Sequence, residues 1–231
     1  DINGGSNFII DGRAGGTGTT KELTIANTST SGTAVRFINE GSTNTLQYVT
    51  LTGVNSGTSS GVILFSTTTG ANGNDNNTID NCDIRDGATT PTIGVYSLGT
   101  NTSVSTRNSG NTISNCNIFN FYNSTSTASG GYGVNLSTGS TDWTITGNSF
   151  YQTASRTSFG SGATVSGINI ATLSGNNFTV SNNFLGGTAP SCGGTAYTVS
   201  STGSVIFRGI FISVDLTTAS NITGNTVRNI S

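Results

Sequence analysis

The sequence predicts an all-β fold, a right-handed parallel β-helix of about six to seven coils. Two observations support this prediction. A similar motif of seven or eight residues recurs through the chain, and apolar residues alternate with small polar ones inside each copy. Self-similarity at a fixed period is typical of solenoids, and a period of two is typical of a strand with one buried face. The copies lie at residues 44–51, 77–84, 111–118, 143–150, 178–185 and 221–227.

One apolar residue anchors each copy of the motif. Successive anchors lie 33, 34, 32, 35 and 42 positions apart. Strands that repeat in the same chain direction pair in parallel, about 4.8 Å apart. Because one strand pair cannot bury its own apolar face, the repeats must stack as the coils of a solenoid. The anchors are Leu46, Ile79, Ile113, Ile145, Val180 and Ile222.

A second alternating run precedes each motif, so every repeat carries at least two short strands. From the second run onward, a glycine stands just before it, which predicts a corner where a Cβ would be unfavourable. Helices are not expected, because no stretch has apolar residues at helical spacing and Thr, Ser, Asn and Gly form helices poorly. The runs lie at 35–38, 62–65, 95–98, 134–136, 168–170 and 210–214, and the glycines are Gly61, Gly94, Gly133, Gly167 and Gly209.

Stacking of the repeats predicts columns of equivalent side chains. Three positions after the anchors, we expect a structural ladder in which asparagine amides hydrogen-bond from coil to coil and two thiols act as small apolar fillers. A disulfide between the two thiols is sterically conceivable but is not implied. The ladder contains Cys82, Cys116, Asn148, Asn183 and Asn225. The outward positions beside the anchors predict a face rich in hydroxyl groups, which includes Thr78, Thr112, Ser114, Thr144, Thr146, Thr179 and Ser181.

Composition limits the classes of function. Residues 1–231 are long enough for one continuous core, and we expect a single domain that belongs to a longer solenoid or a stacked assembly, because terminal repeats usually need a cap. Only 8% of the residues are charged and the net charge is −2, which argues against a nucleic-acid partner. No apolar run approaches the roughly 20 residues of a membrane span, so no membrane insertion is expected. The low charge and abundant Ser, Thr and Asn suit a secreted or surface protein.

The densest acidic patch is the least implausible catalytic site. It contains Asp80, Asp83 and Asp86, with Arg85 between them. Inverting hydrolysis of a glycan needs two carboxylates about 6.5–9.5 Å apart, but the matching places on the next repeat hold Ser114 and Asn117. We therefore expect solvated charges rather than catalytic residues, and no cofactor. Because clustered oxygen ligands suit hard cations, a weak calcium site is an alternative.

Long loops supply the candidate contact surface, because insertions in a solenoid tend to project on one face. They span residues 66–75, 99–110, 153–166 and 186–204. Aromatic rings near them are candidates for stacking on sugars, and they equally suit the covering of coil corners. These rings are Tyr122, Tyr132, Tyr151, Phe159 and Tyr197. The hydroxyl face offers a different function, because an array of Thr-x-Thr pairs can order water in an ice-like lattice.

The motif Asn-x-Ile-x-Asn-Asn/Cys-x-Ile resembles the parallel β-helix repeat of the pectate-lyase-like superfamily. Segments 8–13, 23–29, 34–39, 142–152 and 186–194 resemble the large secreted β-helix proteins of Bacteroidota that use type IX secretion. The superfamily resemblance implies a polysaccharide lyase or hydrolase, but the hydrolases use a histidine, which is absent, and the lyases use Arg or Lys beside Ca²⁺ held by several acids. The narrower resemblance implies an adhesin-like role in an extracellular setting.

The leading hypothesis is therefore a non-enzymatic extracellular or cell-surface module, which acts as a stalk, an adhesin segment or a fibre-forming unit. Its expected partners are other copies or further coils of the same solenoid, joined end to end, and a cell-surface glycan bound through the loops. A carbohydrate-active lyase or hydrolase is the first alternative, and an ice-binding protein is the second.

Overall fold

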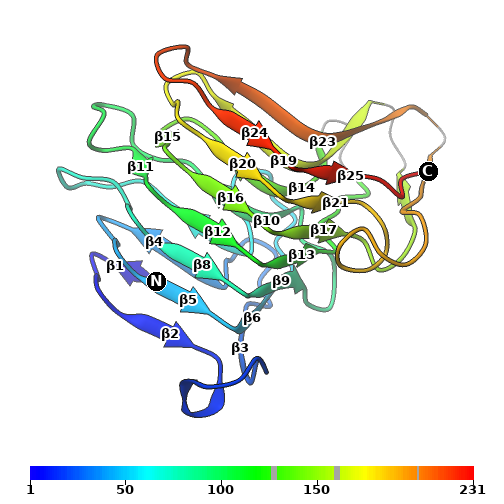
Figure 1. The fold of residues 1–231 in the computed structure, drawn as a ribbon, viewed down its shortest axis with the longest axis horizontal. Coiled ribbons are helices and arrows are strands. Elements are labelled where there is room, and N and C mark those ends of the chain that lie inside the picture. The colour runs from blue at the N-terminus through cyan, green and yellow to red at the C-terminus, as the bar shows by residue number, and fades with distance from the viewer. Residues whose placement is uncertain (126–128, 159–161, 202) are drawn as a thin grey trace.

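The computed structural model describes residues 1–231 except 126–128, 159–161 and 202, and the described part forms a parallel β-helix of seven coils (Figure 1). Each coil contributes one strand to each of three parallel sheets, which we name A, B and C. Each sheet has seven strands in the described chain. The predicted all-β parallel β-helix of six to seven coils is thus confirmed.

The strands of each sheet follow one another from the first coil to the seventh. Sheet A contains β1 (Ile2–Asn3), β4 (Val35–Ile38), β7 (Ile63–Phe65), β10 (Ile93–Ser97), β14 (Ser129–Leu136), β19 (Ala163–Thr172) and β23 (Val205–Val214). Sheet B contains β2 (Ile9–Asp11), β5 (Thr45–Gln47), β8 (Thr78–Asp80), β12 (Thr112–Ser114), β16 (Thr144–Thr146), β20 (Thr179–Ser181) and β24 (Asn221–Thr223). Sheet C contains β3 (Leu23–Ala26), β6 (Val49–Gly53), β9 (Asp83–Asp86), β13 (Asn117–Phe119), β17 (Ser149–Tyr151), β21 (Phe184–Leu185) and β25 (Thr226–Val227).

A few short elements lie between these strands. Two small parallel pairs join neighbouring connections, β11 (Asn108–Ser109) with β15 (Ser140–Thr141) and β18 (Arg156–Ser158) with β22 (Val199–Ser201). A 3₁₀ turn, η1 (Ala14–Gly16), lies in the connection from β2 to β3. Within the described residues, no helix has the length and apolar character needed to cross a membrane.

The predicted anchors share one register along sheet B. Leu46 pairs with Ile79, and the pairing continues without a shift to Ile222, with Ile10 of the first coil added below Leu46. The anchors of the inner coils are fully buried. Their outward neighbours therefore form two straight columns on the solvent side of sheet B, as the period of two requires.

The motif is not one strand, because it bends between sheets B and C. The residue two positions after the anchor has a positive φ, for example 51° at Asn81 and 53° at Asn115. Asparagine and glycine adopt this left-handed conformation more readily than other residues, and they occupy most places in this column. Its members after the first coil are Tyr48, Asn81, Asn115, Gly147, Asn182 and Gly224.

The sequence predicted corners at the recurring glycines, and this is wrong for four of the five; Gly61 lies outside the strands, just before β7. Gly94, Gly133, Gly167 and Gly209 lie inside strands of sheet A. A Cβ on Gly133 would lie 2.4 Å from Cδ1 of Phe150, and one on Gly167 would lie 2.3 Å from Cδ2 of Leu185. Phe150 and Leu185 belong to sheet C, so these glycines let sheet A approach the inward side chains of sheet C across a narrow core.

Candidate functional site

The acidic patch is divided between two sheets. Asp80 ends β8 on sheet B, and the other members lie on β9 of sheet C, where Asp83 and Arg85 flank the buried Ile84 and so face outward. Asp83 therefore lies on a strand. Because the chain turns at Asn81 between the two strands, the four residues do not line one common face.

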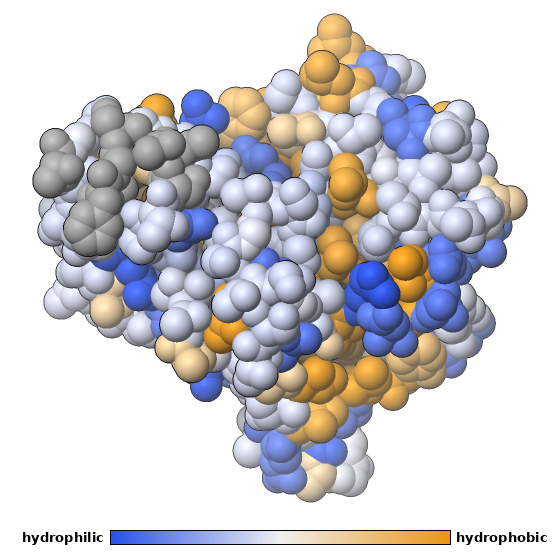
Figure 2. Space-filling model, turned by 180° about the vertical axis from the view of Figure 1, so that it is seen from behind, coloured by the Kyte–Doolittle hydropathy of each residue, from blue (hydrophilic) through white to orange (hydrophobic). Residues whose placement is uncertain are grey.

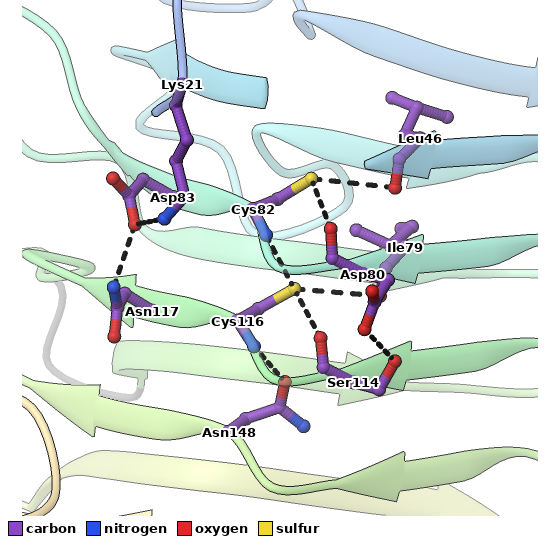
Figure 3. Close-up of polar contacts among 10 residues, drawn as sticks. All are labelled: Lys21, Leu46, Ile79, Asp80, Cys82, Asp83, Ser114, Cys116, Asn117 and Asn148. Carbon is purple, nitrogen blue, oxygen red and sulfur yellow. Dashed lines mark hydrogen bonds and ion pairs between the residues drawn. The ribbon is translucent and has the colours of Figure 1, made fainter. Parts of the chain in front are cut away.

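Hydrogen bonds to the next coil occupy Asp80 (Figure 3). Its Oδ1 accepts from the hydroxyl of Ser114 at 2.6 Å and from Nδ2 of Asn115 at 3.0 Å. Its Oδ2 accepts from Nδ2 of Asn81 at 2.6 Å. Asp80 therefore clamps the corner of its own coil to the corner of the coil that follows.

Asp83 and Asp86 are engaged in the same way. Asp83 forms an ion pair with Lys21, and its Oδ1 also accepts from Nδ2 of Asn117 at 2.8 Å. Asp86 accepts from Nδ2 of Asn120 at 3.1 Å and lies 3.6 Å from Nη1 of Arg85. Each carboxylate thus joins neighbouring coils. Among the described residues, no group of three or more His, Cys, Asp or Glu side chains has a geometry that could hold a metal ion.

The predicted ladder lies at the corner between sheets B and C. Cys82 donates its backbone N–H to Sγ of Cys116 at 3.3 Å, and Cys116 donates its own to Oδ1 of Asn148 at 2.9 Å (Figure 3). Nδ2 of Asn148 then donates to Oδ1 of Asn183, and Nδ2 of Asn183 to Oδ1 of Asn225. Both thiols are free and buried, and burial raises the pKa of the Cys116 thiol well above its ordinary value.

Two further amide ladders were missed by the sequence interpretation. Asn44, Asn77 and Asn111 lie two positions before their anchors, and each Nδ2 of the first two donates to the next Oδ1 at 3.1 Å. Asn74 donates to Asn108 in the same manner at 2.9 Å. The first of these ladders had a signal in the sequence, because Asn opens three successive copies of the motif.

The loop aromatics offer little open ring surface. Tyr122, Tyr151 and Tyr197 are buried, and Tyr132 is half-buried on β14. Phe159 lies outside the described residues. Tyr151 stacks on Phe119, with ring centroids 4.7 Å apart, and burial raises the pKa of Tyr151 to about 12. Burial also raises the pKa of Tyr197. These rings contact the coils rather than project from them.

The two hydroxyl columns of sheet B differ in their bonding. In one column, Ser114 donates to Asp80, and the hydroxyls of Thr146 and Ser181 lie 2.9 Å apart and share a hydrogen bond. In the other column, no side-chain hydrogen bond is found for any hydroxyl within the described part of the chain. That column runs in register through Thr45, Thr78, Thr112, Thr144 and Thr179.

Comparisons of the chain with models of protein families, with curated proteins and with solved structures found no match.

Proposed function

We propose that this chain is a non-enzymatic, extracellular or cell-surface β-helix module that serves as a rigid scaffold, such as a stalk or an adhesin segment. One observation carries the proposal: the carboxylates that would have to act in catalysis are bound to neighbouring coils. Asp80 accepts three hydrogen bonds, and Asp83 holds both Lys21 and Asn117.

General acid–base catalysis needs a carboxylate within hydrogen-bond reach of the substrate, with its partner group on the same surface. Here the outward neighbours on the next coil are Ser114 and Asn117, which carry no ionisable group. Coil-to-coil bonds at the surface, together with amide ladders inside, resist bending between coils. These features favour a mechanical role.

The proposal is tested by incubating the protein with neutral and acidic polysaccharides and measuring the release of reducing ends and unsaturated products. We expect no product. The variant with Asp80→Asn, Asp83→Asn and Asp86→Asn should lose thermal stability, because the charged acceptors are lost, and its glycan binding should match that of the native chain. Products that form with the native chain and disappear in this folded variant would overturn the scaffold function in favour of a lyase or hydrolase. Glycan binding through the loops stays a prediction, which is tested by measuring the binding of the native chain to the same polysaccharides.

A second candidate function, ice binding, is favoured by the unbonded threonine column. Threonines on adjacent coils repeat about every 4.8 Å, and their hydroxyls are not engaged within the described protein, so they can bind ordered water. The test is thermal hysteresis of the native chain and of Thr144→Lys, with Thr146→Lys from the bonded column as the control. We expect Thr144→Lys to have the larger loss. A native chain without hysteresis would exclude this function.

A further inference from the structure

The hydrogen bonds that join successive members of the ladder column have one direction. At each step, the backbone N–H of one coil donates to the side chain at the same position of the next coil. Asn148 donates in this way to Oδ1 of Asn183 at 3.0 Å, and Asn183 to Oδ1 of Asn225 at 3.0 Å. The side-chain amides repeat the same two donations. The column therefore has an accepting side toward the N-terminal coils and a donating side toward the C-terminal coils.

Asn225 is the last member of the column in the part of the chain that the structure describes. Its Oδ1 accepts both bonds from Asn183, and its Nδ2 donates back to the carbonyl of Val180 at 2.8 Å. No acceptor for its backbone N–H is found in the part of the chain that the structure describes. Asn225 thus presents the donating end of the ladder at the C-terminal face.

The apolar core is open at the same face. Ile222 and Val227 are each 50% exposed, whereas Val180 and Leu185, which precede them in the same columns, are fully buried. Among the described strands, β23, β24 and β25 each pair on one side only. They form the upper edge of the molecule in Figure 1, and apolar side chains are visible along that edge in Figure 2.

We infer that this C-terminal face binds one further parallel β-coil whose residue opposite Asn225 is an asparagine or carries another side-chain oxygen. Such a coil would accept the N–H and the amide of Asn225, pair with the three edge strands, and cover Ile222 and Val227 with its own anchors. This inference rests on the proposed scaffold function and names the chemistry of its partner.

The first coil of a second copy does not have this chemistry. The register places Leu23 beside Val49, and Val49 beside Cys82, so the ladder column begins with two aliphatic residues. Head-to-tail stacking of two copies would place Leu23 over Asn225. The N–H of Asn225 would then be buried without an acceptor, which is unfavourable. The occupant is therefore an amide-bearing coil and not a second copy of this chain.

The test adds such a coil to the full chain. A copy of residues 123–152, which contains Asn148, is appended after Ser231, where it continues the register of the preceding coils. The matched control carries Asn148→Leu in the appended copy. We expect hydrogen exchange of the Asn225 backbone amide, followed by NMR, to slow at least about tenfold more in the asparagine extension than in the leucine control, since one buried hydrogen bond is worth about that factor.

Equal exchange of Asn225 in the two extensions, with the amides of β20 protected in both, would overturn the inference. A second extension, residues 89–119 with Cys116→Asn in the copy, repeats the test on a different coil in case the first does not fold. Sedimentation of the native chain over a range of concentrations tests whether copies of the chain stack on one another. Growth into filaments would show that a second copy occupies the C-terminal face and would overturn the inference. None of these measurements depends on glycan cleavage, so a failure here is distinguishable from a failure of the scaffold function.

Discussion

The two ends of the β-helix are built differently. Of the four ion pairs found among the described residues, three involve the first coil: Asp1 with Arg36, Asp11 with Arg13, and Lys21 with Asp83. The seventh coil takes part in none of the four. Both end coils expose apolar side chains, Ile9 and Leu23 in the first coil and Ile222 and Val227 in the seventh, but only the seventh presents the donating end of the ladder.

The difference follows from how each end treats its edge strands. Charged side chains on an edge oppose the pairing of a further strand, and in the first coil the connection from β2 to β3 folds back along the outside, so that Lys21 reaches Asp83 two coils away. The ladder column begins there with Leu23 and Val49, which need no partner for a polar group. The first coil thus carries charged pairs beside its edge strands, whereas the seventh coil presents a backbone donor that has no acceptor in the described chain.

The largest expected effect contrasts two members of the ladder. Asn183→Leu should destabilise the chain by about 3 kcal/mol or more, because the backbone N–H and Nδ2 of Asn148 both lose a buried acceptor. Asn225→Leu removes the acceptor of the same two donors of Asn183 but should cost only about 1 kcal/mol, because water can reach them at the half-buried end of the column. Urea unfolding of both variants gives the two free energies. Equal losses would mean that the C-terminal coil is as closed as the interior.

The core columns should show the same gradient with a smaller difference. Ile113→Ala removes a fully buried anchor and should cost about 2–5 kcal/mol. Ile222→Ala removes an anchor that is 50% exposed and should cost roughly half as much, because half of its apolar surface already contacts water. Chemical denaturation of the two variants measures this difference. A larger loss at Ile222 than at Ile113 would contradict the description of an open C-terminal face.

Part of this arrangement could be predicted from the sequence. The anchors, the ladder and the hydroxyl columns follow from period two and from a repeat of constant length, and the register in sheet B matches the predicted one from Leu46 to Ile222. The bend at Asn81 was missed, although Asn and Gly recur there, because an alternating pattern hides a single left-handed residue.

Contacts between distant side chains could not be predicted. The ion pair of Lys21 with Asp83 depends on the path of the irregular connection at residues 12–22, and no periodic signal describes that path. The role of the recurring glycines also depended on a distance across the core, which Phe150 and Leu185 determine from another sheet. The unpaired backbone N–H of Asn225, in the described chain, could be recognised only after the direction of the ladder hydrogen bonds was known.

A smaller effect is expected at the ion pair of Lys21. Lys21→Gln should lower stability by about 0.5–1 kcal/mol, because the pair is only partly buried and Asp83 keeps its hydrogen bond from Asn117. Arg228→Gln, in the seventh coil, is the control and should change little, as Arg228 is in none of the ion pairs of the described residues. Thermal unfolding at low salt measures the change in stability of both variants. Equal shifts in melting temperature for the two variants would show that the ion pair of Lys21 does not distinguish the two ends.

The smallest expected effect is the response to acid. Hydrogen bonds from Arg13 lower the pKa of Asp11 in the first coil, and the hydroxyl of Thr217 lowers the pKa of Asp215 in the seventh. A carboxylate with a lowered pKa stabilises the folded chain above its unfolded pKa of about 3.9 and loses this contribution as the pH falls through the folded value. Asp11→Asn and Asp215→Asn should therefore each flatten the loss of thermal stability below about pH 4.

Salt separates these two carboxylates. Asp11 accepts from the Arg13 guanidinium as well as from Nε2 of Gln47 and the backbone N–H of Arg13, so added salt should weaken the cationic part of its contribution. Asp215 accepts from neutral groups, the hydroxyl of Thr217 and the backbone N–H of Leu216. The measurement is the melting temperature of the native chain and of both variants between about pH 5 and about pH 2, at low and at high salt. We expect high salt to reduce the difference between native and Asp11→Asn and to preserve that between native and Asp215→Asn. The opposite order would mean that the first coil is not held by its charges, and the contrast between the two ends would then rest on the ladder alone.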